Sequence, residues 1–230
     1  MNIAKENRAI EYLRAFEPYN EPYFLCYSGG KDSDTVRILA ELAGVKYDLV
    51  HNLTTIDAPE TYYYVKSVGA EIVLPPKSMW QLIVENGMPP TRLVRYCCKA
   101  LKEGTGAGRV KITGVRRAES VNRAQNNDVI KIIGKPKTVR KLADNSEVDY
   151  YLSKKGGLLL SDDCDNNRRF VEDVHKTASV NLNPIVDWTE NDVWEFLRYH
   201  GCESNPLYQC GYSRIGCVGC PMKNTKGMLA

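Results

Sequence analysis

Two glycines and a lysine, Gly29, Gly30 and Lys31, separate an apolar run from a segment with helical spacing. Backbone N–H groups that small residues expose at the positive end of a helix bind anions, and a lysine adds a mobile charge. The turn is not a Walker A loop, because the first glycine of G-x-x-x-x-G-K-[ST] is missing at the required spacing. The residues alone leave two interpretations open, a phosphate-binding loop and an ordinary strand-to-helix turn.

Four of the eight cysteines form two close pairs, Cys97/Cys98 and Cys217/Cys220. A C-x-x-C turn places two thiolates on one metal, and an adjacent pair on a helix supplies sulfur ligands from a second element. Four thiolates suit zinc or an iron–sulfur cluster, and the spacing does not choose between them. The alternative is that these are simply buried thiols, as free cysteines often are.

Three arginines, Arg116, Arg117 and Arg123, follow an apolar segment at residues 109–115. Guanidinium groups bind phosphate or sulfate through two parallel hydrogen bonds, which a lysine does less specifically. The alternative is a solvated helix start in which the arginines pair with Glu119. Because the glycine turn also predicts an anion, we favour anion binding.

These residues lie in a chain that alternates strands and helices. Apolar runs predict strands at residues 23–28, 47–53, 71–75 and 109–115, and helical spacing predicts helices at 6–16, 59–69, 78–87 and 95–103. A further helix, capped by Asp32 or Ser33, should end at Gly44. This alternation predicts a doubly wound α/β fold with a mostly parallel sheet and helices on both faces. Residues 28–33, 54–57 and 114–117 would then converge at the carboxyl ends of the strands, where such sheets bind ligands.

We expect one domain over residues 1–230, a length that can bury a proper core. Weak periodicity predicts an irregular or β-rich insertion at residues 124–180. For the basic segment 135–141 we favour a solvated loop over contact with a nucleic acid or a nucleotide phosphate. Order returns at Thr189 and Asp192, which resemble a capping box. Residues 202–230 are a cysteine-containing tail that we expect to pack on the domain.

The net charge of +3 is too mild to identify a nucleic-acid binder. No N-terminal signal segment and no membrane-spanning run is recognisable, so we expect a cytoplasmic protein without a membrane partner. In a reducing compartment, eight cysteines indicate metal or sulfur chemistry rather than disulfides.

The string SGGKDS resembles the SGGxDS pyrophosphate loop of the ATP-pyrophosphatase superfamily, which has the adenine nucleotide alpha hydrolase-like fold. The resemblance implies an adenine nucleotide that is attacked at its α-phosphate or at a group attached to it. It assigns phosphate binding to Ser28, Gly29, Gly30, Lys31, Asp32 and Ser33.

Three further segments, TTIDAPETYYYV, GVRRAESVNR and NPIVDWTENDVWEFL, are similar to adenylylsulfate and phosphoadenylylsulfate (PAPS) reductases. With the glycine turn, the resemblance spans roughly residues 20 to 221, with a gap in the middle. It adds as nucleotide-binding residues Asp57, Glu60, Thr61, Gly114, Arg116, Glu119, Ser120 and Arg123. It also implies catalytic roles for Lys31, Asp32 and Arg116.

The cysteine pairs resemble those of assimilatory adenylylsulfate reductases, which hold a four-iron four-sulfur cluster. The resemblance implies this cluster, with zinc as the alternative, on Cys97, Cys98, Cys217 and Cys220. The reductases end in a Glu-Cys-Gly segment whose thiolate attacks sulfur, whereas here no cysteine follows Cys220. Because a reducing nucleophile must be a reachable thiolate, Cys210 is the substitute candidate.

Residues 211–220 resemble the closing GxxRxGCxxC of PAPS-reductase-like proteins of mobile elements and DNA phosphorothioation systems. The resemblance implies ATP cleavage between the α- and β-phosphates, with Lys31 and Mg²⁺ stabilising the pyrophosphate.

Our first hypothesis is a PAPS-reductase-family enzyme of sulfur metabolism that acts on ATP, adenylylsulfate or PAPS. One alternative is an ATP pyrophosphatase that activates a nucleic-acid substrate for sulfur incorporation. The other is a non-catalytic nucleotide-binding module with structural zinc. The predicted partners are an adenine nucleotide and a protein that donates sulfur or electrons. A nucleic-acid substrate and a homodimer stay open.

Overall fold

The computed structural model describes residues 2–146 and 148–222. The chain forms two compact units, which we describe separately. Unit 1 comprises the chain up to residue 26, residues 31–48 and residues 106–202; unit 2 comprises residues 27–30, 49–105 and the chain from residue 203. The single domain expected over residues 1–230 stays a prediction.

The strands join in the order β3-β2-β1-β4-β8-β5-β7-β6. They are β1 (Tyr23–Cys26), β2 (Tyr47–Asn52), β3 (Glu71–Val73), β4 (Val110–Ile112), β5 (Ile130–Ile133), β6 (Tyr151–Leu152), β7 (Leu158–Leu160) and β8 (Ser179–Leu182). β1, β4 and β8 are parallel, as are β2 and β3, whereas β5 runs antiparallel to both β8 and β7. The predicted α/β fold with a mostly parallel sheet is confirmed.

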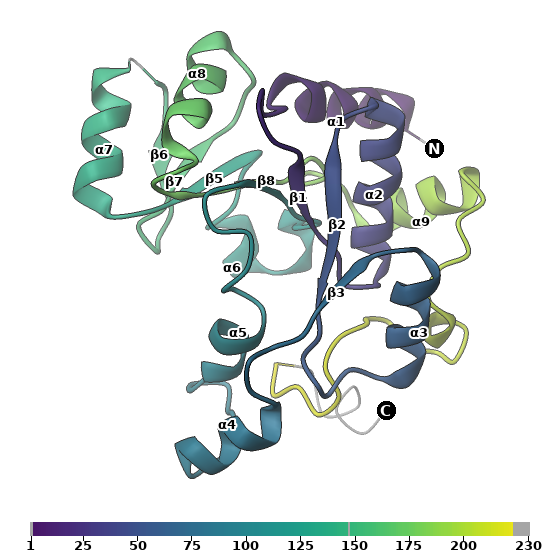
Figure 1. Ribbon diagram of the computed structural model, residues 1–230. Coiled ribbons are helices and arrows are strands. Elements are labelled where there is room, and N and C mark those ends of the chain that lie inside the picture. Colours follow the sequence, from purple (N-terminus) through teal and green to yellow (C-terminus); the bar gives the residue numbers. More distant parts are fainter. Residues whose placement is uncertain (1, 147, 223–230) are drawn as a thin grey trace. The chain divides into compact units, whose positions relative to one another are not determined.

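The helices predicted at residues 6–16, 59–69, 78–87 and 95–103 and the one ending at Gly44 are confirmed, whereas those at residues 121–124, 136–145 and 165–174 were not predicted (Figure 1). The helices are α1 (Ile3–Ala15), α2 (Lys31–Ala43), α3 (Pro59–Ser67), α4 (Met79–Asn86), α5 (Tyr96–Leu101), α6 (Val121–Ala124), α7 (Pro136–Asn145), α8 (Asp165–Val174) and α9 (Glu190–Tyr199). The capping box of Thr189 and Asp192 starts α9 as predicted. Helix α2 begins at Lys31, so the predicted cap at Asp32 or Ser33 is wrong. Asp32 lies in the first turn instead, where its charge complements the helix dipole.

In unit 1 the strand registers separate an apolar row from a polar row. Leu25, Ile112, Leu182, Ile130 and Leu160 pair in one row, and all five are fully buried. Helix α2 contacts both α1 and α9 (Figure 1). Burial of this row and of the helix faces supplies most of the hydrophobic stabilisation of the unit.

The segment 124–180, predicted as irregular or β-rich, contains the strands β5 to β7, the start of β8, and the helices α7 and α8. Helix α8 buries Phe170, Val171 and Val174, while most of its other residues are polar and exposed. Such a narrow apolar stripe is a weak periodic signal in sequence. The basic segment 135–141 starts helix α7 rather than forming a loop.

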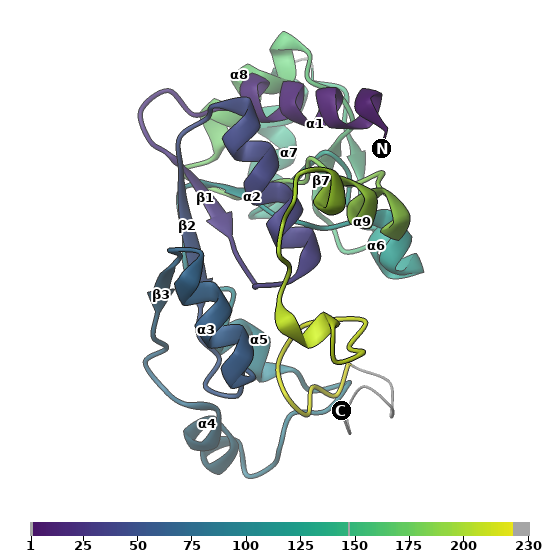
Figure 2. The ribbon, with the colours of Figure 1, turned by 90° about the vertical axis from the view of Figure 1, so that its right-hand side faces the viewer.

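Unit 2 has a small core of Met79, Leu82 and Leu101, against which Ile56 and Cys97 pack. The tail of the unit contains a 3₁₀ turn, η2 (Pro206–Tyr208), which contacts α3 (Figure 2). Residues 223–230 of the predicted tail lie outside the described residues. No helix in the described part of the chain is long and apolar enough to cross a bilayer.

Candidate functional site

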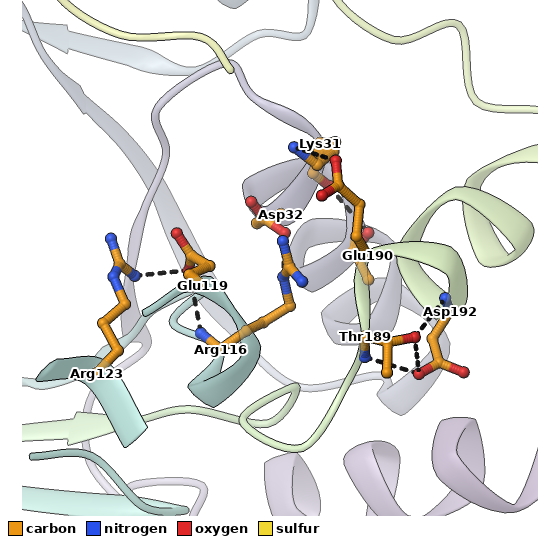
Figure 3. A network of polar contacts seen from close by, with 9 residues as sticks. Lys31, Asp32, Arg116, Glu119, Arg123, Thr189, Glu190 and Asp192 are labelled. Carbon is orange, nitrogen blue, oxygen red and sulfur yellow. Dashed lines mark hydrogen bonds and ion pairs between the residues drawn. The ribbon is translucent and has the colours of Figure 1, made fainter. Parts of the chain in front are cut away.

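Lys31 lies in the first turn of α2 in unit 1, and its side chain is only 5% exposed. Its ammonium is 3.5 Å from a carboxylate oxygen of Glu190, the first residue of α9 (Figure 3). It also lies 5.8 Å from the ring centroid of Trp194. The Glu190 side chain is 60% exposed, so an anion that approaches Lys31 competes with a carboxylate that water can solvate.

Asp32 and Arg116 form an ion pair in the same unit, in which the arginine is buried and the aspartate partly exposed (Figure 3). Nε of Arg116 donates to Oδ1 of Asp32 at 2.6 Å, and Arg116 is 3% exposed. A guanidinium has five N–H groups, so this bond leaves the two terminal amino groups for another acceptor. Gly114 allows the close approach, because a Cβ there would lie 2.9 Å from the Asp32 carbonyl carbon. Three predicted catalytic residues therefore meet in unit 1.

Glu119 links Arg116 to Arg123 (Figure 3). Its Oε1 accepts from the Arg116 backbone N–H at 3.2 Å and from the Arg123 guanidinium at 2.7 Å. The Ser120 hydroxyl accepts from the Arg123 backbone N–H at 3.2 Å and so caps α6. These predicted nucleotide-binding residues order the segment after β4, and their contact with a nucleotide stays a prediction.

Arg117 has other partners, the carboxylates of Asp128 and Asp187. Burial raises the pKa of Asp128, against the effect of the Arg117 charge. The guanidinium is therefore engaged by two carboxylates, neither of which is the Glu119 of the alternative interpretation.

The glycine turn belongs to unit 2 as far as Gly30. Gly29 has a left-handed φ of +70°, and a Cβ there would lie 2.9 Å from a valine methyl carbon, so the position requires glycine. The fully buried Asn205 donates from Nδ2 to the Gly29 carbonyl at 3.0 Å and to Thr61 Oγ1 at 3.2 Å. The tail and α3 thus hold the turn. The predicted loop therefore has its residues 28–30 in unit 2 and its residues 31–33 in unit 1.

Asp57 orders the segment after β2 in unit 2. Its Oδ2 accepts from the Thr54 backbone N–H at 2.7 Å and lies 4.0 Å from Nε2 of the buried His51. Nδ1 of His51 is 2.9 Å from the Tyr27 carbonyl oxygen, so this nitrogen carries the proton. Burial lowers the pKa of His51. Glu60 is exposed in the first turn of α3.

The predicted sulfur ligands lie on two segments of unit 2. Cys97 and Cys98 are on α5, and the Cys217 thiol is 3.5 Å from Thr54 Oγ1. The Val218 N–H donates to the Ile56 carbonyl at 2.9 Å, which fixes the loop that carries Cys217 and Cys220. Burial, then the neighbouring thiols Cys98 and Cys217, raise the pKa of Cys97.

A lysine accompanies these thiols. Desolvation opposes the charge of Lys102, but the Cys217 sulfur accepts a hydrogen bond from its ammonium and raises the pKa of Lys102. Within residues 2–146 and 148–222, no three His, Cys, Asp or Glu side chains are grouped closely enough to hold a metal ion. The donor chemistry still fits a soft metal or a cluster, because cysteine sulfurs are the ligands that zinc and iron–sulfur clusters prefer.

The remaining cysteines differ in surroundings. Burial raises the pKa of Cys26 to about 11, so this thiol is inert at neutral pH. Cys210, the candidate nucleophile, is exposed in the turn after η2 of unit 2. Cys164 is also exposed, at the N-cap of α8 in unit 1. Exposure is what a reachable thiol requires, and the catalytic role of Cys210 stays a prediction.

Sequence reasoning missed the partners of the predicted residues. Glu190 and Trp194 flank Lys31, Asn205 holds Gly29, and Lys102 accompanies the thiols. Glu190 carried a signal, since it is the first-turn acid of a recognised capping box. Asn205 carried none, because it lies 176 residues from Gly29 in a segment without periodicity.

A family model matches most of the chain. Residues 22–223 match the phosphoadenosine phosphosulfate reductase domain. An uncharacterized protein of Methanocaldococcus jannaschii is 27% identical over 232 residues, which cover 94% of this chain and 40% of that protein. An adenosine 5'-phosphosulfate reductase of Allochromatium vinosum is 46% identical over 46 residues, 20% of this chain and 18% of the reductase. The chain thus spans about two fifths of the length of the archaeal relative.

A solved structure supports the fold. The phosphoadenylyl-sulfate (PAPS) reductase from Candida auris, in a phosphate complex, superposes with a TM-score of 0.53 at 15% identity. The alignment covers 91% of this chain and 87% of that one. At this identity the likeness concerns the arrangement of strands and helices alone. Because the matched domain takes in the glycine turn, the arginine segment and both cysteine pairs, the chain belongs to the phosphoadenosine phosphosulfate reductase family.

Proposed function

We propose that this protein is an enzyme that binds an adenylyl nucleotide at residues 28–33 and acts at its α-phosphate or on a sulfate attached to it. The observation that carries the proposal is the construction of the glycine turn. Gly29 is left-handed, its carbonyl is occupied by Asn205, and the turn continues directly into the 13-residue helix α2. Backbone N–H groups at such a helix start carry a partial positive charge that binds phosphate.

Lys31 would neutralise phosphate charge by exchanging partners. Its buried side chain is matched by a carboxylate, Glu190, that is itself largely exposed. When a phosphate oxygen replaces this carboxylate, Glu190 passes into water at little cost. The pair therefore holds Lys31 in place before the nucleotide binds.

Two reactions use the same groups. With ATP, a substrate oxygen attacks the α-phosphorus, the bond to the bridging oxygen of the β-phosphate breaks, and pyrophosphate leaves with Lys31 stabilising its charge. A bound Mg²⁺ would supply further positive charge to the leaving group. With adenylylsulfate or PAPS, a thiolate attacks sulfur, the sulfur–oxygen bond breaks, and the adenosine phosphate leaves. Cys210 is the candidate thiolate for the second reaction, because it is exposed.

We also propose that Cys97, Cys98, Cys217 and Cys220 hold a four-iron four-sulfur cluster. The support is the chemistry of the donor set: the thiols of Cys98 and Cys217 neighbour that of Cys97, and the Cys217 sulfur accepts a hydrogen bond from the Lys102 ammonium. A bound cluster would supply a redox-active, polarising group within unit 2. Zinc is the alternative that the same four thiolates allow.

Product analysis tests the proposed reaction. Anaerobically purified protein is incubated separately with ATP, adenylylsulfate and PAPS, the last two with dithiothreitol as reductant, and pyrophosphate and sulfite are measured. We expect one of the two products, and we expect Lys31→Gln to abolish it, because the loop then lacks its mobile charge. Lys46→Gln is the control, since Lys46 is exposed and lies just before β2.

The competing function is a nucleotide-binding module without catalysis. It predicts tight nucleotide binding with neither product, even in protein loaded with its metal. The ion pair of Asp32 with the buried Arg116 argues for catalysis, because a module that only binds has no need of a second ion pair beside its phosphate loop.

A further inference from the structure

The second glycine of the turn, Gly30, lacks the backbone conformation that explains the first. Gly29 has a left-handed φ, whereas the φ of Gly30 lies outside that region. What Gly30 lacks is room for a side chain. A Cβ there would lie 3.3 Å from the Tyr208 hydroxyl and 3.6 Å from the Ser28 hydroxyl, with Ile215 as the third neighbour at 3.5 Å. The missing side chain therefore lets a tyrosine of the tail reach the backbone of the turn.

Tyr208 is positioned by the same residue that holds the turn. It lies in η2, and its backbone N–H donates to the Asn205 carbonyl at 3.0 Å. The Asn205 side chain accepts from the Leu207 N–H at 3.1 Å and donates to the Gly29 carbonyl at 3.0 Å. Because Asn205 is fully buried, water does not compete for these bonds. One side chain thus fixes both the turn and η2 within unit 2.

Further contacts attach η2 to the rest of unit 2. The tail packs against α3 at η2, and the Tyr64 hydroxyl of α3 donates to the Glu203 carbonyl at 3.0 Å (Figure 2). On the other side of η2, the Tyr212 N–H donates to the Leu207 carbonyl at 3.2 Å. The position of the Tyr208 backbone beside the turn is therefore set by the fold of the unit.

Two hydroxyls consequently border the glycine turn, those of Ser28 and Tyr208. Both lie within 3.6 Å of the same point beside Gly30. Ser28 is exposed and Tyr208 is half-buried, so a ligand on the turn can reach them. A hydroxyl donates one hydrogen bond, and such bonds are shorter and stronger when the acceptor is ionised. Hydroxyls in this position are suited to the oxygens of a bound anion.

We propose that the Tyr208 hydroxyl donates a hydrogen bond to an oxygen of the phosphate that the glycine turn binds, next to the Ser28 hydroxyl. The inference rests on the proposed function, because it requires a nucleotide phosphate at residues 28–33. It adds to the site a binding residue from the tail. It also gives Gly30 a role of its own, since a side chain there would crowd the phenol that approaches the turn.

Tyr208→Phe tests the proposal, because it removes the hydroxyl and keeps the ring. Equilibrium binding is measured for AMP, for ATP and for adenosine, which has no phosphate. We expect the affinities for AMP and ATP to fall about tenfold, as for the loss of one hydrogen bond to a charged oxygen. The affinity for adenosine should not change. Ser28→Ala should give the same pattern, because both hydroxyls then serve the same phosphate.

Tyr63→Phe is the matched control in the same unit. Tyr63 lies on α3 and is 67% exposed, whereas Thr61 and Val65 of that helix face Gly29. Removal of its hydroxyl should leave the affinities for AMP, ATP and adenosine at their wild-type values. Urea unfolding of each variant shows whether the fold is intact.

A tyrosine that only supports the fold gives a different result. Tyr208→Phe would then weaken AMP and adenosine binding together, or lower the stability to urea with no change in affinity, and either outcome would overturn the inference. Wild-type affinity for AMP and ATP in Tyr208→Phe, beside weaker binding in Ser28→Ala, would also overturn it and leave the proposed function intact. If the wild-type protein binds neither AMP nor ATP, the proposed function fails, and the inference fails with it.

Discussion

Asn205 is the buried side chain on which the glycine turn depends within unit 2. Substitution by alanine removes the donor to the Gly29 carbonyl and to Thr61 Oγ1, and leaves both acceptors buried. We expect Asn205→Ala to lower the free energy of unfolding by about 1–3 kcal/mol and to weaken nucleotide binding about tenfold or more. Urea denaturation and a nucleotide titration measure the two effects.

Asn205→Asp should be worse for binding than alanine, because it places an acceptor against the Gly29 carbonyl. Asn20→Asp is the matched control, since Asn20 is exposed and its side chain has no hydrogen-bond partner among the described residues. Wild-type nucleotide affinity in Asn205→Asp would show that the turn does not need this amide.

His51 gives the protein a dependence on pH. Because its folded pKa lies below the ordinary value of 6.5, the neutral ring is favoured in the folded state. His51 therefore contributes stability above about pH 6.5, and this contribution is lost as the pH falls through the folded pKa, by at most about 1.4 kcal/mol per pH unit. Urea unfolding at pH 7.5 and 5.5 should show a smaller loss for His51→Gln than for the wild type. An identical loss in both proteins would contradict this assignment.

The side chains that could be predicted are those within motifs. Lys31, Asp32 and Arg116 were recognised because their segments resemble family motifs, and the structure pairs Asp32 with Arg116. Glu190 and Asn205 complete the surroundings of these motifs from distant parts of the chain. Such contacts depend on how the elements pack, and residue spacing within one segment does not encode them.

The close contact between the end of β4 and the start of α2 can be tested for its effect on stability and on nucleotide binding. Gly114→Ala would place a Cβ 2.9 Å from the Asp32 backbone, which would push the two elements apart. We expect a cost of about 1–3 kcal/mol in stability and a loss of nucleotide binding, because the Asp32–Arg116 pair is displaced. Thermal denaturation and the same nucleotide titration measure both.

Gly104→Ala is the control for this substitution. A Cβ at Gly104 would meet no described atom within 4 Å, and the backbone there has no left-handed φ, so alanine should change stability by less than about 0.5 kcal/mol. If both variants bind nucleotide equally, the close approach at Gly114 has no bearing on the site.

Strands and helices with strong periodicity were predictable, and the direction of β5 was not. Residues 23–28 and 189–199 carry clear apolar or capping patterns, and the structure confirms them. β5 and β7 pair antiparallel through short apolar runs that look the same in either direction. Strand direction follows from the connections between elements, which here pass through the polar helices α7 and α8.

For the protein as a whole, metal content decides between the two cofactor proposals. We expect anaerobically purified protein to contain iron, and Cys217→Ser to lose most of it, because Cys217 is a proposed ligand that neighbours the Cys97 thiol. Cys164→Ser is the control, since this exposed cysteine lies in unit 1. Elemental analysis with visible spectra measures the result, and colourless protein with zinc would favour the structural-metal alternative.

Because β5 runs opposite to β8, the segments before and after β5 lie at opposite ends of the strands in the unit 1 sheet. Ile130 pairs with Leu182 at the carboxyl end of β8, whereas Ile133 pairs with Ser179 at its beginning. The chain that follows β5 therefore leaves the sheet at the amino ends of the parallel strands, whereas Lys31 and Arg116 follow the carboxyl ends of β1 and β4. Lys135, the exposed N-cap of α7, lies at this amino end of the parallel strands. Its amine is consequently a point of attachment for immobilisation or a fluorophore that leaves the carboxyl ends of the parallel strands accessible to a nucleotide.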